Sequence, residues 1–149
     1  MTRTRTWAAA AAAAVGLLTA AAAPVAADQP ARAAAPVPWS VSLGTAGAAG
    51  ERWTEPSAYP GLPDLVISGT LTNTGTGCYA VWTRFYRDFS VGPVTKQAEI
   101  CGPGSAAVAA RQSYGFTTTG YVTVCRGTAN TADCAPWANI TWWPIDPSS

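Results

Sequence analysis

The sequence predicts an all-β protein: an antiparallel β-sandwich of about seven short strands with two disulfides, preceded by a signal peptide. Beyond residue 38, short runs of alternating apolar and polar residues are separated by Gly- and Pro-containing segments at near-regular spacing. No run after the first 27 residues shows a sustained helical period. Charged residues make up only 11% of the chain, so Thr, Ser, Gly, Asn and Gln must form the solvated surface, which suits sheets better than helices.

The N-terminal 27 residues have the features of a secretory signal peptide. Arg3 and Arg5 give a positively charged start, and an Ala-rich apolar run follows them. The run ends in small residues that predict cleavage between Ala27 and Asp28. It is short and weakly hydrophobic for a membrane anchor, which needs about 20 strongly apolar residues. We therefore expect a secreted, extracellular protein whose mature form does not span a membrane.

The chain beyond the signal peptide divides into three parts. Residues 28–38 contain Ala and Pro without periodicity and predict a flexible linker. Residues 39–145 hold all the alternating runs and form the predicted sandwich domain, and residues 146–149 form a short tail. The mature chain is near neutral and its only lysine is Lys96. Nucleic acid is therefore not an expected partner, because phosphate binding needs clustered basic residues.

The first half of the domain contains two alternating runs. Residues 39–43 alternate strictly between apolar and polar, and residues 64–72 form a longer run whose two faces differ in polarity. The small residues 44–50 predict a loop between them, and the Pro-rich residues 56–63 predict a connection. The face of the second run that is expected to meet the core carries Leu65, Ile67 and Leu71.

Residues 78–89 predict the next strand, and its two faces differ. The first face carries Tyr79, Val81 and Phe85. The second face includes an arginine, and an unpaired charge in the core costs several kcal/mol, so we expect the first face to point inward. Trp82, Arg84 and Tyr86 then form a solvent-facing stripe with alternate residues about 7 Å apart. The alternative is that Trp82 is the packed tryptophan that sandwiches often keep on a central strand.

The second half of the domain continues with strands between turn signals. Gly92 and Pro93 predict one turn, and residues 102–104 predict another in which glycine adopts positive φ. The strands expected here are residues 94–100, 106–112, 120–125 and 138–143. In the last of these, Trp142 and Trp143 point to opposite faces, so we expect one indole in the core and the other at the surface.

The four cysteines all lie in the predicted domain. An even number in a small exported domain predicts two disulfides, for which three connectivities exist. Cys125 and Cys134 flank one loop, so a local bridge is favoured there, and Cys78 is then left to pair with Cys101. The alternative is a zinc site made of all four thiolates, but the sequence has no Cys-x-x-Cys pair. We therefore expect no metal and no cofactor.

The sequence offers no recognisable catalytic group. It contains no histidine, so a nucleophilic cysteine or serine has no imidazole base. The eight carboxylates are scattered, and no pair of them has the motif of a glycosidase around it. We therefore expect no catalytic residues and a protein that is not an enzyme.

Two groups of motifs resemble known families. Leu71-Thr72-Asn73-Thr74-Gly75 after an alternating strand, followed by a second strand, resembles the opening of bacterial immunoglobulin-like domains of the cell-adhesion-related (CARDB) type. The motifs GCYAVW, ICGPG and VTVCRGT are similar to those of small uncharacterised secreted proteins of high-GC Gram-positive bacteria. The resemblance covers residues 64–143. It implies an immunoglobulin-like sandwich and brings no catalytic residues with it.

The leading functional hypothesis is a secreted, non-catalytic immunoglobulin-like module with a binding or structural role at the cell surface or outside the cell. The first alternative is a carbohydrate-binding module in which Trp82, Arg84, Tyr86 and Trp143 contact a cell-wall or other polysaccharide. The second is a small extracellular enzyme inhibitor with a rigid exposed loop at residues 102–104 or 126–133. The expected partner is thus a polysaccharide or an extracellular protein.

Overall fold

Strands account for most of the described chain. The computed structural model describes residues 35–58 and 61–143, and these residues form eight strands and no helix. The strands are β1 (Val37–Leu43), β2 (Ala46–Glu55), β3 (Asp64–Asn73), β4 (Cys78–Arg87), β5 (Ser90–Cys101), β6 (Gly104–Ser113), β7 (Thr119–Arg126) and β8 (Ala138–Asn139). The predicted signal peptide, most of the predicted linker and the predicted tail lie outside the described residues.

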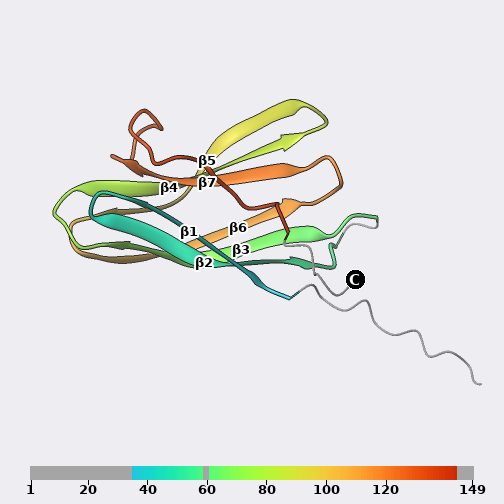
Figure 1. Cartoon of the computed structure of the whole chain (residues 1–149), viewed down its shortest axis with the longest axis horizontal. Coiled ribbons are helices and arrows are strands. Elements are labelled where there is room, and N and C mark those ends of the chain that lie inside the picture. Colours follow the sequence, from blue (N-terminus) through green and yellow to red (C-terminus); the bar gives the residue numbers. More distant parts are fainter. Residues whose placement is uncertain (1–34, 59–60, 144–149) are drawn as a thin grey trace, which may run out of the picture. The chain divides into compact units, whose positions relative to one another are not determined.

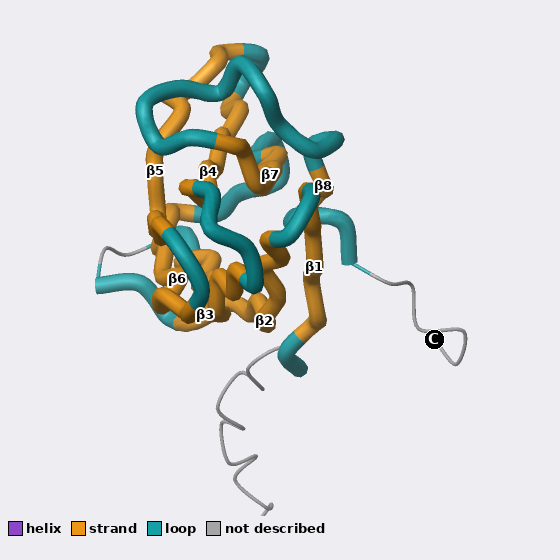
Figure 2. Tube along the Cα trace, turned by 90° about the vertical axis from the view of Figure 1, so that its left-hand side faces the viewer, coloured by secondary structure: helices purple, strands orange, loops and turns teal. Residues whose placement is uncertain are grey.

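The strands form two antiparallel four-stranded sheets that pack face to face (Figure 1). The first sheet has the order β1-β2-β3-β6 and the second has the order β5-β4-β7-β8. Seen end-on, β5, β4, β7 and β8 lie over β6, β3, β2 and β1 (Figure 2). Seven strands have seven residues or more, and β8 has two. The predicted all-β sandwich of about seven main strands with two disulfides is confirmed.

The interior of the sandwich is formed by the faces that the alternating runs predict. The apolar residues of the predicted core face of β3 are fully buried: Leu65, Ile67 and Leu71. On β4, Tyr79 and Val81 are buried and Phe85 packs against the core, so the predicted orientation of this strand is confirmed. The other buried members of the core are Trp39, Ala46, Ala48, Val108, Val122, Val124 and Ile140. Removing this apolar surface from water is the main term that stabilises the two layers.

The prediction of a loop at residues 44–50 is wrong, because most of this segment belongs to β2. Gly50 of β2 lies directly opposite Gly69 of β3. A Cβ added to Gly69 would lie 2.7 Å from Cζ2 of Trp39, and one added to Gly50 would lie 2.0 Å from the carbonyl oxygen of Ser68. Gly50 therefore permits the close approach of β3 and does not mark a loop, and Gly69 on β3 makes room for the buried indole of Trp39.

The prediction of a turn at Gly92 and Pro93 is also wrong. β4 and β5 are joined by a two-residue turn, Asp88 and Phe89, between the paired ends of the strands. Gly92 and Pro93 lie within β5 at a shift in its register with β4. Glycine and proline are tolerated there because a bulge on an edge strand leaves a residue outside the hydrogen-bonded ladder.

Two strand boundaries differ from those predicted. β1 begins at Val37, inside the predicted linker. The predicted strand at residues 138–143 ends at Asn139, and the Ile140 N–H makes one further bond to β7, to the Gly120 carbonyl oxygen at 2.9 Å. The Asn139 carboxamide oxygen accepts hydrogen bonds from the backbone N–H groups of Thr141 and Trp142 at 2.8 and 2.7 Å, and this local turn ends the strand.

Both favoured disulfides are present. Cys78–Cys101 joins directly paired residues of β4 and β5, whose Cα atoms are 4.0 Å apart. Cys125–Cys134 joins the end of β7 to the loop before β8, with Cα atoms 3.9 Å apart. In the chain-entropy view each bridge stabilises the fold by about 3 kcal/mol by restricting the unfolded chain. Both lie at one end of the sandwich, which we call the disulfide end.

Asn73, the last residue of β3, organises the connections at the disulfide end. Its side chain is 1% exposed. Its Nδ2 donates to the carbonyl oxygens of Gly75, Gly77 and Gly102 at 3.0, 2.9 and 2.9 Å. Its Oδ1 accepts from the Gly75 N–H at 3.0 Å and the Thr45 hydroxyl at 2.8 Å. One carboxamide therefore links the β1–β2 turn, the β3–β4 loop and the β5–β6 turn.

Candidate functional site

The predicted stripe of Trp82, Arg84 and Tyr86 lies on the outer face of the second sheet, and all three residues are half-buried. The second disulfide ties the loop of residues 127–137 back toward this face. Tyr86 packs edge-on against Tyr121 of β7, with ring centroids 5.8 Å apart. The structure thus brings the three residues together, as predicted, but as a partly covered surface.

Positively charged side chains of this chain lie over the aromatic rings on this face of the sheet. The Lys96 ammonium lies 5.8 Å from the ring centroid of Trp82, and the Arg84 guanidinium lies 5.0 Å from that of Trp137. Such contacts are attractive because the ring face carries partial negative charge. A sugar that stacked on Trp82 would compete with Lys96 for this ring. The arrangement favours packing, and carbohydrate contact stays a prediction.

Trp143 does not join the stripe and packs instead against the core. Its indole N–H donates to the Tyr114 hydroxyl at 2.8 Å, and its ring lies 5.5 Å from the guanidinium of Arg52. Arg52 is 5% exposed and donates to the carbonyl oxygens of Trp142 and Pro38 at 2.6 and 3.4 Å. Burial lowers the pKa of Arg52 from its usual value. These contacts fasten the chain after β8 to the first sheet.

The turn between β4 and β5 has an unusual backbone at the end of the sandwich opposite the disulfides. Asp88 and Phe89 have φ angles of 47° and 64°, in the left-handed region. A two-residue hairpin turn of this kind favours Asn, Asp and Gly, and a bulky residue at positive φ is a true outlier. Phe89 is 104% exposed, so no packing against the described residues offsets the strain. Strained residues of this kind are concentrated at functional sites.

Other exposed apolar side chains lie near Phe89. Phe116, between β6 and β7, is fully exposed, and Val91 and Leu62 are 65% and 47% exposed. We call this region the hairpin end, and it comprises residues 61–63, 87–91 and 114–118. Single exposed apolar residues are ordinary. Four at one end of a small domain, two of them phenylalanines, form a patch of the kind that marks interaction surfaces.

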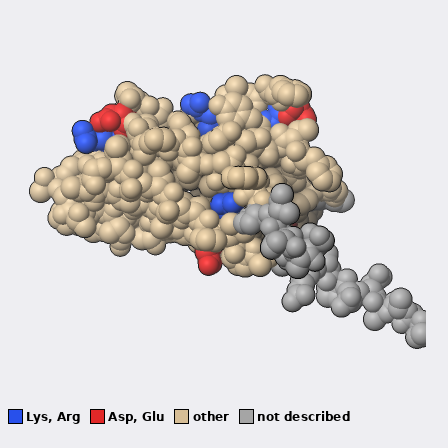
Figure 3. Space-filling model, in the orientation of Figure 1, with Lys and Arg blue, Asp and Glu red and all other residues tan. Residues whose placement is uncertain are grey.

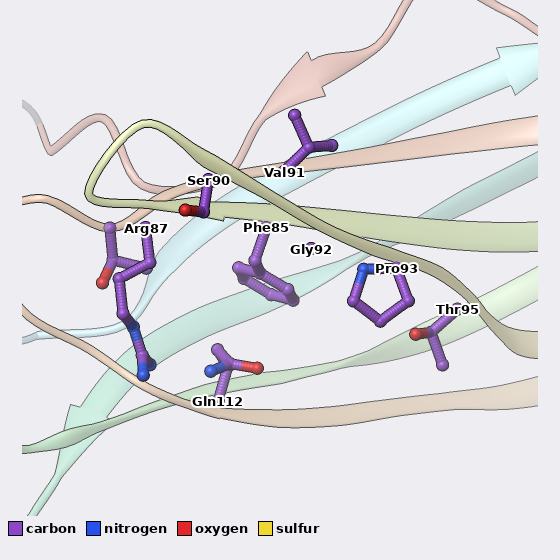
Figure 4. A pocket seen from close by; sticks show the side chains of 9 residues that line it. Phe85, Arg87, Ser90, Val91, Gly92, Pro93, Thr95 and Gln112 are labelled. Atoms are coloured by element: carbon purple, nitrogen blue, oxygen red, sulfur yellow. The ribbon is translucent and has the colours of Figure 1, made fainter.

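Three hollows open at the hairpin end, with volumes of about 260, 210 and 350 Å³. Arg87 lines the first and second, and Asp88 lines the second and third. Figure 4 shows the first hollow, with Phe85, Pro93 and Gln112 around it. Small-molecule sites usually measure about 300–1,000 Å³, so two hollows are smaller than this range and the third is near its lower limit.

Arg87 supplies the hydrogen-bonding capacity of the hairpin end. Its Nη2 donates to the Ser113 carbonyl oxygen at 2.9 Å, and no described carboxylate pairs with it. The ion pairs in the described part of the chain are Lys96–Glu99, Arg111–Glu55, Arg111–Asp64 and Arg126–Asp133. Charged side chains are also sparse on the face seen in Figure 3. The remaining donors of Arg87 are therefore open to a carboxylate or carbonyl of a partner.

The sequence prediction misses both phenylalanines of this patch. It assigns Phe89 to the end of a strand, because the segment Arg-Asp-Phe-Ser contains no glycine. The usable signal is Asp88, a residue type that tolerates positive φ, placed between two alternating runs. For Phe116 the signal is an aromatic residue that follows Gly115 in a connection between strands, where exposed side chains often bind.

Within residues 35–58 and 61–143, no three His, Cys, Asp or Glu side chains are grouped so that they would hold a metal ion. The same residues contain no helix that is long and apolar enough to cross a membrane. Comparison of the chain with protein-family models, with curated proteins and with solved structures gives no significant match. Function must therefore be argued from the site itself.

Proposed function

We propose that this protein is an exported, non-catalytic immunoglobulin-like module that binds a protein partner through the hairpin end. The strand order supports the immunoglobulin-like type. β2-β3-β6 and β5-β4-β7-β8 correspond to the A-B-E and C′-C-F-G strands of that fold, with β1 as an added edge strand. Two disulfides in a small domain favour an oxidising compartment outside the cytosol, as does the signal-like N-terminal sequence.

The observation that carries the binding role is Phe89. Its backbone costs about 1–2 kcal/mol in the left-handed region, and its ring is fully exposed. A glycine at this position would remove both the strain and the exposed ring. A strained and solvent-exposed phenylalanine supports the interpretation that the ring serves a contact outside the domain. Aromatic anchors with a neighbouring arginine are the residue types that dominate binding energy at protein interfaces.

A protein partner is favoured over a sugar for two reasons. Phe89 and Phe116 have no hydrogen-bonding groups of their own, and sugar sites combine ring stacking with several polar contacts. A partner that inserts apolar groups into the hollows beside them would bury Val91 and Leu62 as well. The carbohydrate alternative depends on stacking against Trp82, and the Lys96 ammonium already lies over that ring.

Photo-crosslinking tests this proposal. Phe89 is replaced by the photoreactive analogue benzoyl-phenylalanine, which keeps an aromatic ring at the tip of the turn. The matched control places the same analogue at Thr70, an exposed residue on the outer face of the first sheet. Irradiation in the culture of the producing cells is expected to give a protein adduct from position 89 and none from position 70.

Competition decides whether such an adduct is specific. An excess of the natural chain is expected to suppress it, and an excess of the Phe89→Ser/Phe116→Ser double variant is not. Both phenylalanines are fully exposed, so this variant is expected to fold normally. Equal adducts at positions 89 and 70, or equal suppression by both competitors, would contradict the proposal.

A further inference from the structure

The outer strands of the sandwich differ in how their edges are protected. β8 has only two residues, and β5 contains Pro93, Lys96 and two register shifts. β1 contains Pro38 near its start. Contact with the opposite sheet does not distinguish the edges of the first sheet, because β1 lies against β7 and β6 lies against β5. Residues 105–110 of β6 contain no proline, glycine or charge, and β6 pairs with β3 without a register shift. An unprotected edge of this kind is a template for another strand.

The backbone of β6 presents alternate residues to this open edge. The Tyr114 N–H donates to the Pro63 carbonyl oxygen at 2.8 Å, and this bond continues the β3–β6 ladder. Because antiparallel ladders alternate, the even-numbered residues of β6 bond to β3 and the odd-numbered ones turn their N–H and C=O groups outward. The Ser113 carbonyl, which accepts from Arg87, agrees with this assignment. The outward groups belong to Ser105, Ala107, Ala109 and Arg111.

We propose that β6 pairs antiparallel with β6 of a second copy of this chain, about a two-fold axis at Val108. In this register Ala107 faces the partner's Ala109, and Ser105 faces the partner's Arg111. The outward backbone N–H and C=O groups of these four residues in each strand then pair with those of the other copy. The two four-stranded sheets join into one continuous sheet, and the interface is the same patch on both copies.

The side chains that meet in this register are complementary. On the outer face, the small side chains of Ala107 and Ala109 lie opposite each other without crowding. On the inner face, Val108 meets its own copy. Arg111, whose charge is paired with Glu55 and Asp64, faces a serine, so no like charges are opposed. In a second copy the same uncharged residues lie opposite each other because of the two-fold symmetry, so this complementarity favours self-association over pairing with a strand of another protein.

Sedimentation velocity of the purified protein tests the proposal directly. A reversible dimer is expected, whose population rises with protein concentration. A monomer at every concentration would overturn the proposal. This result would leave the proposed partner binding untouched, because the hairpin end lies outside residues 105–111 of β6.

A pair of charge variants tests the register. The Ala107→Lys/Ala109→Lys double variant places lysines opposite lysines across the two-fold axis. The Ala107→Lys/Ala109→Glu double variant places each lysine opposite a glutamate. Both alter the same two exposed positions, so they serve as matched controls for folding. The dissociation constant of the first is expected to exceed that of the second by about tenfold or more. Equal dissociation constants would exclude this register.

Amide hydrogen exchange resolves the pairing residue by residue. In a monomer the outward N–H groups of Ala107 and Ala109 exchange rapidly, while those of Ala106 and Val108 are protected by β3. In the proposed dimer all four are protected, and the outward pair gains protection as the protein concentration rises. Rapid exchange at Ala107 and Ala109 in a sample that sediments as a dimer would place the interface elsewhere.

Discussion

Replacement of Phe89 by glycine is expected to stabilise the protein. Phe89 occupies the second position of the β4–β5 turn with φ of 64°, and its ring is fully exposed. An L-residue in this left-handed region of φ costs about 1–2 kcal/mol, and glycine avoids this cost. No packing is lost with the ring. Most single substitutions destabilise, so a gain would be informative.

The size of the gain follows from two opposing effects. Relief of strain contributes about 1–2 kcal/mol, and the extra freedom of glycine in the unfolded chain takes back about 0.5–1 kcal/mol. The expected net change in the free energy of unfolding is therefore about 0.5–1 kcal/mol. For a domain of this size that corresponds to an increase of about 2–5 °C in Tm.

Thermal unfolding followed by circular dichroism measures this change, with Phe89→Ala as the matched control. Alanine removes the ring and keeps the strained backbone, so its Tm is expected to equal that of the natural chain. A lower Tm for Phe89→Gly would refute the reasoning, as would equal gains for both variants. If the proposed function holds, Phe89→Gly is more stable and also suppresses the crosslinked adduct less than the natural chain does when added as a competitor, which is the trade-off expected of a strained binding residue.

Three further predictions concern the framework. Asn73→Ala is expected to lower the free energy of unfolding by about 2–4 kcal/mol in urea titrations, because three carbonyl groups lose their donor; a change below about 1 kcal/mol would show that water replaces the carboxamide. Gly69→Ala is expected to cost about 2 kcal/mol or more, because its Cβ would collide with the Ala49 carbonyl oxygen at 2.4 Å and with Trp39 at 2.7 Å; Gly47→Ala, whose Cβ meets nothing closer than 3.7 Å, serves as its neutral control in the same titration. Hydrogen bonds from Thr45 and Arg126 lower the pKa of Tyr79 below its usual value of 10.0, so its ionised form favours folding: this stability is present above pH 10 and is lost as pH falls through the lowered pKa. Ultraviolet titration of the tyrosines is expected to show one that ionises early, and Arg126→Gln is expected to raise its pKa; no change in that variant would contradict the assignment.

Alternation and the cost of burying a charge were sufficient to predict the layers of the fold. Leu65, Ile67 and Leu71 lie in the core because strands have a period of two, and Arg84 correctly indicates which face of β4 points outward. Residues 44–50 are mispredicted because glycine and alanine carry the same local signal in a loop and in a strand that a neighbouring strand approaches closely. Only the close approach of Gly50 to the Ser68 backbone, which depends on the fold, distinguishes the two cases.

The candidate site was harder to predict for a related reason. The stripe of Trp82, Arg84 and Tyr86 is correctly assigned to one face, but its covering by Lys96 and by residues 127–137 depends on contacts between distant segments. Phe89 has no local signal for positive φ, since that conformation is imposed by closure of the hairpin. The five hydrogen bonds of Asn73 likewise depend on segments up to 29 residues apart.

The two ends of this sandwich differ in how freely their sequences can change. Both covalent bridges and the carboxamide of Asn73 lie at the disulfide end, so substitutions there disturb several connections at once. The hairpin end has no disulfide and no buried side chain that links three connections. Its connections are joined by fewer hydrogen bonds, such as those from Tyr114 to Pro63 and from Arg87 to Ser113. New recognition surfaces can therefore evolve, or be engineered, at the exposed residues 88–91 and 116–117 while the opposite end preserves the architecture.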